Sequence, residues 1–389
     1  MSLLLPLRPP LPCRSAAKRI RLSPIPPPRR HASTNTPLPP KHQRTYLRLT
    51  LATLTAAALG FYVRSHSSSS TSSTALNPST FTAYELVSKT PVSSTSSIFT
   101  LRPVTAADSN AAVYKQAWQR GLWSVQFKQP QLQIGRDYTP LPPVSQAEEE
   151  EDGALRFLIR KDPYGEVSGY LHNLALGARV DIRGPRLDYV LPADVEEVLF
   201  IAGGTGIAPG LQAAYNMFSN GNEGSKRMHV LWANRRREDC SGGVSDRPGL
   251  TGASSGPWWR RVFGGGKDVS GEVDATGNVA EKGLMVRQLE ELKAQYPGMF
   301  TVDYFVDEEG TLVGKGSILG FTKLREGKHG QGGGHGSKRR KLILISGPDG
   351  FISYLAGPKM WSSEGKEVQG PLQGLLRQLD LKGWSVWKL

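Results

Sequence analysis

The segment Phe200–Gly210 constrains the fold of this chain most, because three local patterns follow one another in it. Val198–Ala202 is an apolar run of the kind found in buried strands, and Ile207–Phe218 carries apolar residues at helical spacing. A glycine-rich turn between a strand and a helix exposes backbone N–H groups to a diphosphate, and that context makes the motif informative. The candidate nucleotide-binding residues are Gly203, Gly204, Thr205, Gly206 and Pro209.

A second motif, Arg136–Pro143, precedes this turn. It offers a cation, an aromatic ring and a hydroxyl within four residues, and three prolines then stiffen the end of the segment. A guanidinium binds phosphate oxygens through its planar donor fork, and the aromatic ring can lie against a flavin. The motif therefore predicts a flavin site whose candidate residues are Arg136, Tyr138, Thr139 and Pro140.

The region from Phe81 to Leu191 contains short runs with Pro and Gly punctuation, which predict an antiparallel barrel. Two segments interrupt it, Val104–Arg120 and an acidic loop at Glu148–Asp152, and we expect both to be surface additions. The predicted strands are Phe81–Lys89, Ile98–Pro103, Leu122–Phe127, Gln131–Leu141, Leu155–Arg160 and Arg179–Gly184.

The region after Leu191 alternates strand and helix patterns, which predicts a parallel sheet covered by helices. Two Gly-rich stretches interrupt the alternation, at 241–283 and 325–341, and their function is open. The second contains His329 and His335, which are too sparse to predict a metal site. After the glycine turn the predicted elements are Met228–Ala233, Met285–Gln295, Phe300–Asp307 and Leu342–Ile345.

The charge of the chain is concentrated at its N-terminus. The net charge is +14, but residues 1–84 hold eleven Lys or Arg and no acid, which leaves 37 basic against 34 acidic residues afterwards. The later part is nearly neutral, so no nucleic-acid surface is indicated. An acid-free, Arg- and Ser-rich start is typical of a mitochondrial transit segment, and a disordered basic tail with another role is the alternative.

An apolar run at residues 47–63 contains a single charge and is at the short limit for a bilayer span. We expect one short membrane helix there; a helix packed on the protein, or part of a cleaved sorting signal, is the alternative. The basic flank on its N-terminal side favours a body that faces the intermembrane space. Cys13 and Cys240 are far apart, so neither a disulfide nor a metal cluster is supported.

The order of the two motifs, flavin before nucleotide, resembles the ferredoxin-NADP reductase superfamily. The resemblance implies an FAD-binding barrel followed by a parallel-sheet NAD(P)-binding domain, with FAD and either NADH or NADPH as cofactors. The expected organisation is a disordered targeting segment at 1–46, the membrane helix at 47–63, a linker at 64–79, the barrel at 80–192 and the nucleotide domain at 193–389.

Further residues gain roles from this resemblance. Tyr164–His172 resembles the superfamily's second phosphate-binding element, which makes Gly165, Val167 and Ser168 candidate FAD ligands. His172 is tempting as an acid or base, although a structural role is the simpler interpretation. Arg235–Arg237 could bind the 2′-phosphate of NADPH or form a solvated charge run, so the nucleotide preference stays open.

The turn Ser346–Pro348 occupies the position of the superfamily's C-G-P element near the nicotinamide, with Ser346 in place of cysteine. Gly347 and Pro348 are candidate nucleotide ligands. The resemblance implies that Thr139 offers a hydrogen bond near flavin N5, so Thr139 and Ser346 are the candidate catalytic residues. We expect the serine to weaken rather than abolish hydride transfer, because it is small and polar.

The C-terminal segments and the N-terminal apolar run look like the fungal mitochondrial flavoproteins related to the cytochrome c mitochondrial import factor. That resemblance implies an inner-membrane enzyme that passes electrons from NAD(P)H to a haem or haem-protein acceptor and supports haem attachment to cytochrome c beside a haem lyase. Two alternatives remain: an NADH–cytochrome b5 reductase-like enzyme, and a non-catalytic assembly scaffold.

Overall fold

The computed structural model describes residues 75–105, 108–143, 153–219, 226–247, 281–323 and 340–389. By its internal contacts the chain divides into residues 1–70 and 71–389, and every described residue belongs to the second unit. The expected targeting segment, membrane helix and acidic loop lie outside the described residues, as does the linker up to residue 74. Within the described part, no helix is both long and apolar enough to cross a membrane.

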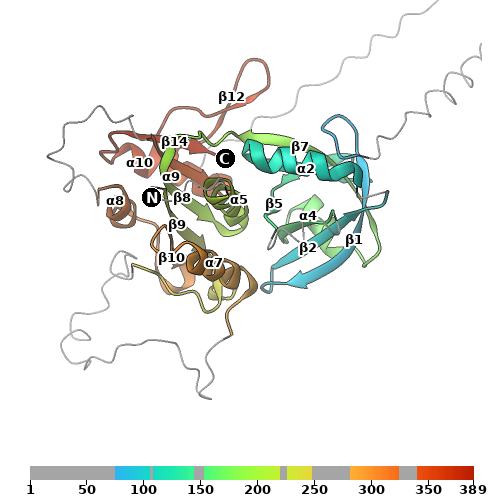
Figure 1. Ribbon diagram of the computed structural model, residues 1–389, viewed down its shortest axis with the longest axis horizontal. Coiled ribbons are helices and arrows are strands. Elements are labelled where there is room, and N and C mark those ends of the chain that lie inside the picture. The colour runs from blue at the N-terminus through green and yellow to red at the C-terminus, as the bar shows by residue number, and fades with distance from the viewer. Residues whose placement is uncertain (1–74, 106–107, 144–152, 220–225, 248–280, 324–339) are drawn as a thin grey trace, which may run out of the picture. The chain divides into compact units, whose positions relative to one another are not determined.

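The first half of the described chain forms a seven-stranded antiparallel sheet in the order β4-β3-β7-β1-β2-β6-β5. Its strands β1 and β2 are drawn in blue in Figure 1. Buried and more exposed residues alternate along its first strands, as expected where only one face of a sheet is packed. The expectation of an antiparallel sheet in this half is confirmed. The strands are β1 (Thr82–Pro91), β2 (Ser96–Pro103), β3 (Leu122–Gln129), β4 (Ile134–Tyr138), β5 (Pro140–Leu141), β6 (Leu155–Arg160) and β7 (Arg179–Tyr189).

The two edge strands of this sheet are consecutive in the chain and are separated only by Thr139. β4 pairs with β3, whereas β5 pairs with β6 at the opposite edge, so the chain crosses between the edges at this residue and joins the sheet into a barrel. The prediction of one strand over Gln131–Leu141 is therefore wrong. Pro140 has no N–H group and cannot continue the ladder of β4.

Helix α2 (Asp108–Arg120) corrects the expectation that Val104–Arg120 is a surface addition. Tyr114, Ala117 and Trp118 are buried in the core of the first sheet. The ring of Trp118 meets that of Trp123 edge to face, with 4.9 Å between centroids. These three residues form an apolar stripe at i, i+3 and i+4, which is a helical spacing. The stripe gives the helix one apolar face, and that face packs into the core instead of lying at the surface.

The second half contains a five-stranded sheet in the order β10-β9-β8-β11-β14, with every neighbouring pair parallel. The chain runs outward from β8 to β9 and β10 and then returns to β11 on the other side of β8. In open sheets of this kind, ligands bind outside the carboxyl ends of the strands at such a switch point. The strands are β8 (Val195–Gly203), β9 (Arg227–Asn234), β10 (Phe300–Val306), β11 (Arg340–Ser346) and β14 (Trp384–Lys388).

Helices cover both faces of the parallel sheet. Side chains of α5 (Ile207–Phe218) and α7 (Leu284–Gln295) share one apolar core with β8, β9 and β10. On the central strands, the residues that alternate with those of the first core share a second core with the other three helices that cover this sheet. These are α8 (Lys315–Thr322), α9 (Asp349–Ala356) and α10 (Gly374–Arg377). Between α9 and α10 lies a small hairpin of β12 (Met360–Trp361) and β13 (Glu367–Val368).

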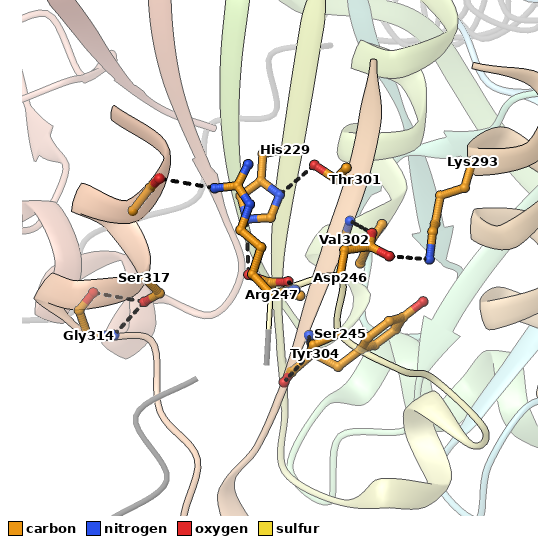
Figure 2. Close-up of polar contacts among 12 residues, drawn as sticks. His229, Ser245, Asp246, Arg247, Lys293, Thr301, Val302, Tyr304, Gly314 and Ser317 are labelled. Carbon is orange, nitrogen blue, oxygen red and sulfur yellow. Dashed lines mark hydrogen bonds and ion pairs between the residues drawn. The ribbon is translucent and has the colours of Figure 1, made fainter. Parts of the chain in front are cut away.

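Side chains cap both edges of the parallel sheet. At β10, the Val302 N–H donates to Asp246 Oδ2 at 2.7 Å and the Tyr304 N–H donates to Ser245 Oγ at 2.8 Å (Figure 2). At β14, the side-chain amide of Gln369 donates to the Lys388 carbonyl and accepts from its N–H, both at 2.8 Å. Ser245 and Asp246 lie in the first part of the stretch expected at 241–283, so that part packs against the sheet.

Candidate functional site

The turns that follow β8 and β11 pack backbone to backbone at the switch point. A Cβ atom on Gly206 would lie 2.5 Å from the Ser346 carbonyl oxygen, and one on Gly203 would lie 2.9 Å from the ring of Phe351. Gly347 has φ +151°, and a Cβ there would lie 3.0 Å from the Gly203 Cα. No side chain fits between these turns. The structure therefore brings together two motifs that the sequence separates by about 140 residues.

The glycine turn leads directly into α5. Its residue Gly204 has φ +54°, and its carbonyl oxygen accepts a hydrogen bond from the Trp232 indole N–H at 2.9 Å. Pro209 is the third residue of α5, where an N–H has no intrahelical acceptor, so proline removes nothing from the helix there. The N–H groups in the first turn of α5, together with a glycine turn that carries few side chains, suit a diphosphate.

The four candidate flavin-binding residues lie where the chain passes from β4 to β5. The Arg136 guanidinium is exposed and donates to the carbonyl oxygen of the preceding residue at 3.1 Å. The Tyr138 ring meets that of Phe127 edge to face, with 5.0 Å between centroids. Burial raises the pKa of the Tyr138 phenol to about 12, so the hydroxyl stays protonated and can donate. Thr139 is the residue between the two strands, and Pro140 is buried.

The second phosphate element forms the start of α4 (Glu166–Asn173). A Cβ on Gly165 would lie 2.5 Å from Ser168 Oγ, so only glycine leaves this turn its present shape. The Ser168 hydroxyl accepts from the Asp162 N–H at 3.1 Å and donates to the Gly165 carbonyl at 3.2 Å. Because that hydroxyl hydrogen is already used, the backbone N–H groups around Val167 are the donors that this turn presents to a phosphate.

His172 makes local contacts on the same helix. Its Nε2 atom lies 3.1 Å from the Ile159 carbonyl oxygen, and its ring meets Phe99 edge to face at 5.0 Å. Burial lowers the pKa of the imidazole, so the neutral form is favoured at neutral pH. These contacts favour the structural interpretation of this histidine.

Gln212 is a residue that the sequence analysis missed. It lies on α5, is fully buried, and hydrogen-bonds the backbone of the first sheet. Its Oε1 accepts from the Trp123 N–H at 2.9 Å, and its Nε2 donates to the carbonyls of Trp123 at 3.1 Å and Pro140 at 2.9 Å. The helix behind the glycine turn is thus bonded to the residue after Thr139. A lone Gln within an apolar helical stripe was the available signal.

A pocket at the carboxyl end of β9 contains further residues that the sequence analysis did not select. Asn234 and Asp239 line it and are only 3% and 9% exposed. Asp239 also accepts a hydrogen bond from the Ser93 hydroxyl at 2.6 Å. The position of polar residues directly after a buried strand was the signal for them. The lining comprises Val92, Ser96, Leu158, Arg160, Gly204, Thr205, Trp232, Asn234, Asp239 and Met285.

The basic run after β9 is largely engaged in ion pairs. Arg237 pairs with Glu309 through two guanidinium nitrogens. Arg236 contacts Glu238 at 3.2 Å, and the same carboxylate accepts bonds from the backbone and hydroxyl of Ser94. These contacts favour the alternative in which the run is a solvated charge run rather than a binding site for a 2′-phosphate.

Metal chemistry receives no support within the described residues, where no cluster of His, Cys, Asp and Glu could hold an ion. Cys240 is buried and free, and burial raises the pKa of its thiol to about 11. A thiol with that pKa is protonated at neutral pH and is a poor nucleophile and ligand.

Comparison with known families matches two domain models to this chain. The model described as an oxidoreductase FAD-binding domain matches residues 83–190, and the one described as an oxidoreductase NAD-binding domain matches residues 200–241. The first range covers the barrel with the Arg136–Pro140 and Gly165–Ser168 elements. The second begins in β8 and includes the glycine turn. FAD and a nicotinamide dinucleotide are thus the cofactors of the two domains.

Curated relatives include NADH-cytochrome b5 reductase 2 of Emericella nidulans, 27% identical over 65% of this chain and 61% of that protein. The cytochrome c mitochondrial import factor of Saccharomyces cerevisiae is 35% identical over 30% of this chain and 34% of that protein. The chain spans about 60% of the length of the reductases it matches. Among solved structures, the cytochrome b5 reductase domain of Ulva prolifera nitrate reductase is 17% identical over 72% of this chain and 91% of that one, with a TM-score of 0.43.

Proposed function

We propose that this chain, which belongs to the ferredoxin-NADP reductase superfamily and carries its FAD-binding and NAD-binding oxidoreductase domains, passes electrons from a nicotinamide dinucleotide through FAD to a haem or haem-protein acceptor. The observation that carries the proposal is the packing of the Gly203–Gly206 turn against the Ser346–Gly347 turn at the switch point. Gln212 bonds the helix of the first turn to the residue after Thr139. The candidate elements for both cofactors are therefore held in one framework.

Each candidate residue has a role in this proposal that its position permits. Arg136 and the first turn of α4 bind the FAD pyrophosphate, while Tyr138 and Thr139 contact the flavin and its ribityl chain. Bound FAD supplies hydride acceptance and single-electron donation. Because one nicotinamide gives up two electrons and a haem iron takes one, each NAD(P)H oxidised reduces two ferric haems and releases one proton.

Ser346 and the residues beside it would shape the nicotinamide end of the site. Ser346 is 8% exposed and ends β11, so its small side chain lies at the carboxyl end of the strand. Gly347 and Pro348 continue the turn against Gly203. A small residue is suited to this position because hydride transfer needs the two reacting rings at close range.

The pocket at the end of β9 favours NADH over NADPH. Asp239 lines this pocket, and a carboxylate there can accept hydrogen bonds from ribose hydroxyls but repels a 2′-phosphate. Arg236 and Arg237 already pair with Glu238 and Glu309. We therefore expect NADH to reduce the flavin at lower concentrations than NADPH.

The acceptor that we favour belongs to cytochrome c maturation at the mitochondrial inner membrane. The support is the resemblance to the cytochrome c mitochondrial import factor, together with the acid-free basic N-terminus and the apolar run at 47–63. In this proposal the run anchors the protein, and the two domains face the intermembrane space and keep haem iron or apocytochrome thiols reduced beside a haem lyase.

A second acceptor, cytochrome b5, is favoured by a different observation. The similarity to NADH-cytochrome b5 reductase 2 of Emericella nidulans extends over 260 residues, whereas that to the import factor extends over 127. Both proposals share the two cofactors and differ in the protein that receives the electrons.

Absorbance spectroscopy of the purified full-length protein in detergent tests the shared part. We expect an FAD spectrum that bleaches when NADH is added without oxygen and returns when ferric haem or cytochrome b5 is added. Cytochrome b5 as the faster acceptor would favour the second candidate. A bound flavin that neither nucleotide bleaches would contradict the enzymatic proposal, and a folded protein without flavin would favour a scaffold.

A further inference from the structure

The crossing from β4 to β5 leaves a gap in the backbone hydrogen bonding of the first sheet. β4 ends with Tyr138 opposite Val125, so Trp123 of β3 lies beyond the end of β4. Pro140 belongs to β5, which pairs with β6 alone in the described sheet. Trp123 and Pro140 are both buried, and a buried backbone N–H or C=O group needs a partner. Some other part of the protein must therefore supply the partners on either side of Thr139.

The side-chain amide of Gln212 supplies them. Gln212 is fully buried, and its Oε1 accepts from the Trp123 N–H at 2.9 Å. Its Nε2 donates to the Trp123 carbonyl at 3.1 Å and to the Pro140 carbonyl at 2.9 Å. A primary amide has two N–H donors and an oxygen acceptor, so both donors and the acceptor are used. The amide pairs with Trp123 as the peptide groups of a neighbouring strand would, and it also reaches β5.

The place of Gln212 on α5 connects this gap to the glycine turn. Gly206 immediately precedes α5, and Gln212 lies in the second turn of the same helix. The i to i−4 hydrogen bonds of a helix hold consecutive turns in fixed geometry, so Gln212 and the first-turn N–H groups move together. At the other end of the hydrogen bond, Pro140 directly follows Thr139, the candidate flavin contact. One buried side chain thus links the residues expected at the two cofactors.

We infer that Gln212 is a positioning residue for hydride transfer, which fixes Thr139 relative to the first turn of α5 and contacts neither cofactor. The inference rests on the proposed function. The transfer moves one hydrogen with two electrons from the nicotinamide, which is oxidised, to FAD, which is reduced. Its rate depends on the distance between the two rings, whereas binding depends on residues that touch each cofactor. Loss of Gln212 should therefore slow the transfer and leave nucleotide binding nearly unchanged.

The test compares Gln212→Leu with the wild-type full-length protein, both with FAD bound. Stopped-flow absorbance without oxygen gives the limiting rate of flavin reduction and the NADH concentration that produces half of it. We expect the limiting rate to fall by about 10- to 100-fold, since a displacement near 1 Å has effects of up to that size, and the half-saturating concentration to change by less than about twofold.

A second measurement does not depend on activity. Hydrogen–deuterium exchange, followed by mass spectrometry in the oxidised protein without nucleotide, reports on the segment 122–141. We expect faster exchange there in Gln212→Leu, because the Trp123 N–H loses its acceptor. Unchanged exchange in this segment would mean that Gln212 does not hold the gap, and would overturn the inference.

Asn216→Leu is the matched control. Asn216 lies one turn further along α5, and its amide donates to the Gly121 carbonyl, just before β3, at 3.3 Å. It also joins α5 to the first half of the protein, but not at the residues that flank Thr139. We therefore expect this variant to be less stable, with a limiting rate within about twofold of wild type. Equal slowing in the Asn216 and Gln212 variants would overturn the specific role of Gln212.

Gln212→Glu provides a variant of the same size in case Gln212→Leu does not fold. A carboxyl group keeps an acceptor but donates only when it is protonated. Its limiting rate, relative to wild type at the same pH, should therefore recover as pH is lowered.

A limiting rate equal to wild type in Gln212→Leu, or in Gln212→Glu at every pH, would overturn the inference. A raised half-saturating concentration with an unchanged limiting rate would also overturn it, since that pattern indicates binding. A wild-type flavin that neither NADH nor NADPH reduces would instead reject the proposed function itself, so the two failures are distinguishable.

Discussion

Two buried polar groups on the parallel sheet differ in how completely their partners satisfy them. One, which we call the edge cluster, consists of His229, Thr301, Asp303 and Arg247 between β9, β10 and α8 (Figure 2). The other is the pocket at the carboxyl end of β9, where the amide of Asn234 has the Cys240 thiol as a weak hydrogen-bond partner. The contrast teaches that burial alone does not identify a functional residue, because both groups are buried and only the second lines a pocket.

The edge cluster is closed by short contacts among its own members. His229 Nδ1 lies 2.8 Å from the Thr301 hydroxyl and its Nε2 lies 3.2 Å from Asp303 Oδ2. The Arg247 N–H donates to Asp303 Oδ1 at 2.9 Å, and the Arg247 guanidinium donates to the Gly320 carbonyl at the end of α8 at 3.2 Å. His229 Nε2 and Asp303 Oδ2 lie at ion-pair distance without the alignment of a hydrogen bond, whereas the other contacts are hydrogen bonds, and we expect the cluster to stabilise the fold.

Breaking the closed cluster should have the largest effect. Asp303→Ala leaves the neutral His229 imidazole and the Arg247 N–H without their buried acceptor, and we expect a loss of about 3 kcal/mol in the free energy of unfolding. Urea denaturation measures it. Asp307→Ala, at an exposed position just after β10, is the control and should change stability by less than about 0.5 kcal/mol. Equal effects of the two variants would mean that the cluster contributes no stability.

Gly206→Ala disturbs the glycine turn beside that pocket. The added Cβ would lie 2.5 Å from the Ser346 carbonyl oxygen and must separate the two turns. We expect FAD to remain bound while NADH reduces it about 100-fold more slowly, since displacements near 1 Å have effects of that size. Stopped-flow absorbance measures the rate. Gly350→Ala, with nothing within 4 Å of its added Cβ, is the control and should be unaffected.

Gln212→Leu sharpens the comparison, because Gln212 is a buried amide whose partners are present. Its loss orphans backbone groups of Trp123 and Pro140, so the free energy of unfolding should fall by about 2 kcal/mol. Urea denaturation provides the measurement, and an unchanged free energy of unfolding would mean that the three hydrogen bonds of Gln212 contribute no stability.

The pH dependence of stability should show the smallest effect. Burial lowers the pKa of His229 below its ordinary value of 6.5, against the opposing influence of Asp303; Arg247 also lowers it, and Asp246 raises it. Below pH 6.5 the unfolded chain then binds more protons than the folded one. The stability that neutral His229 contributes is therefore present above pH 6.5 and is lost as pH falls. Urea midpoints between about pH 7.5 and 5.5 should decline less in His229→Gln than in wild type. An equal decline would assign the dependence to other groups.

Local patterns in the sequence were sufficient to predict the glycine turn and the parallel sheet apart from its edge strand β14. The strand-turn-helix order around Gly203 depends on neighbouring residues alone, and α5 has the predicted bounds, Ile207–Phe218. The break at Thr139 was not predicted, because it follows from β4 and β5 pairing with different strands. Likewise, nothing local distinguishes Asp303 from a solvated acid, since its partner His229 is on another strand.

The site was predicted to the extent that it consists of short motifs. The Gly203–Gly206 and Ser346–Gly347 turns were identified separately, but their mutual contact requires the order of β8 and β11 in the sheet. Gln212 was missed because a single amide carries no motif, and its meaning depends on which groups surround it. The roles assigned to Arg136, Thr139 and Ser168 stay predictions.

The capping of β10 has a consequence for how copies of this protein meet one another. An edge strand normally presents a row of free N–H groups on which a strand from another molecule can form, which leads to aggregation or strand exchange. Along β10 the outward N–H groups are already donated, to acceptors in Tyr296, Asp246, Ser245 and Thr311. That edge therefore offers a second copy no template for sheet extension.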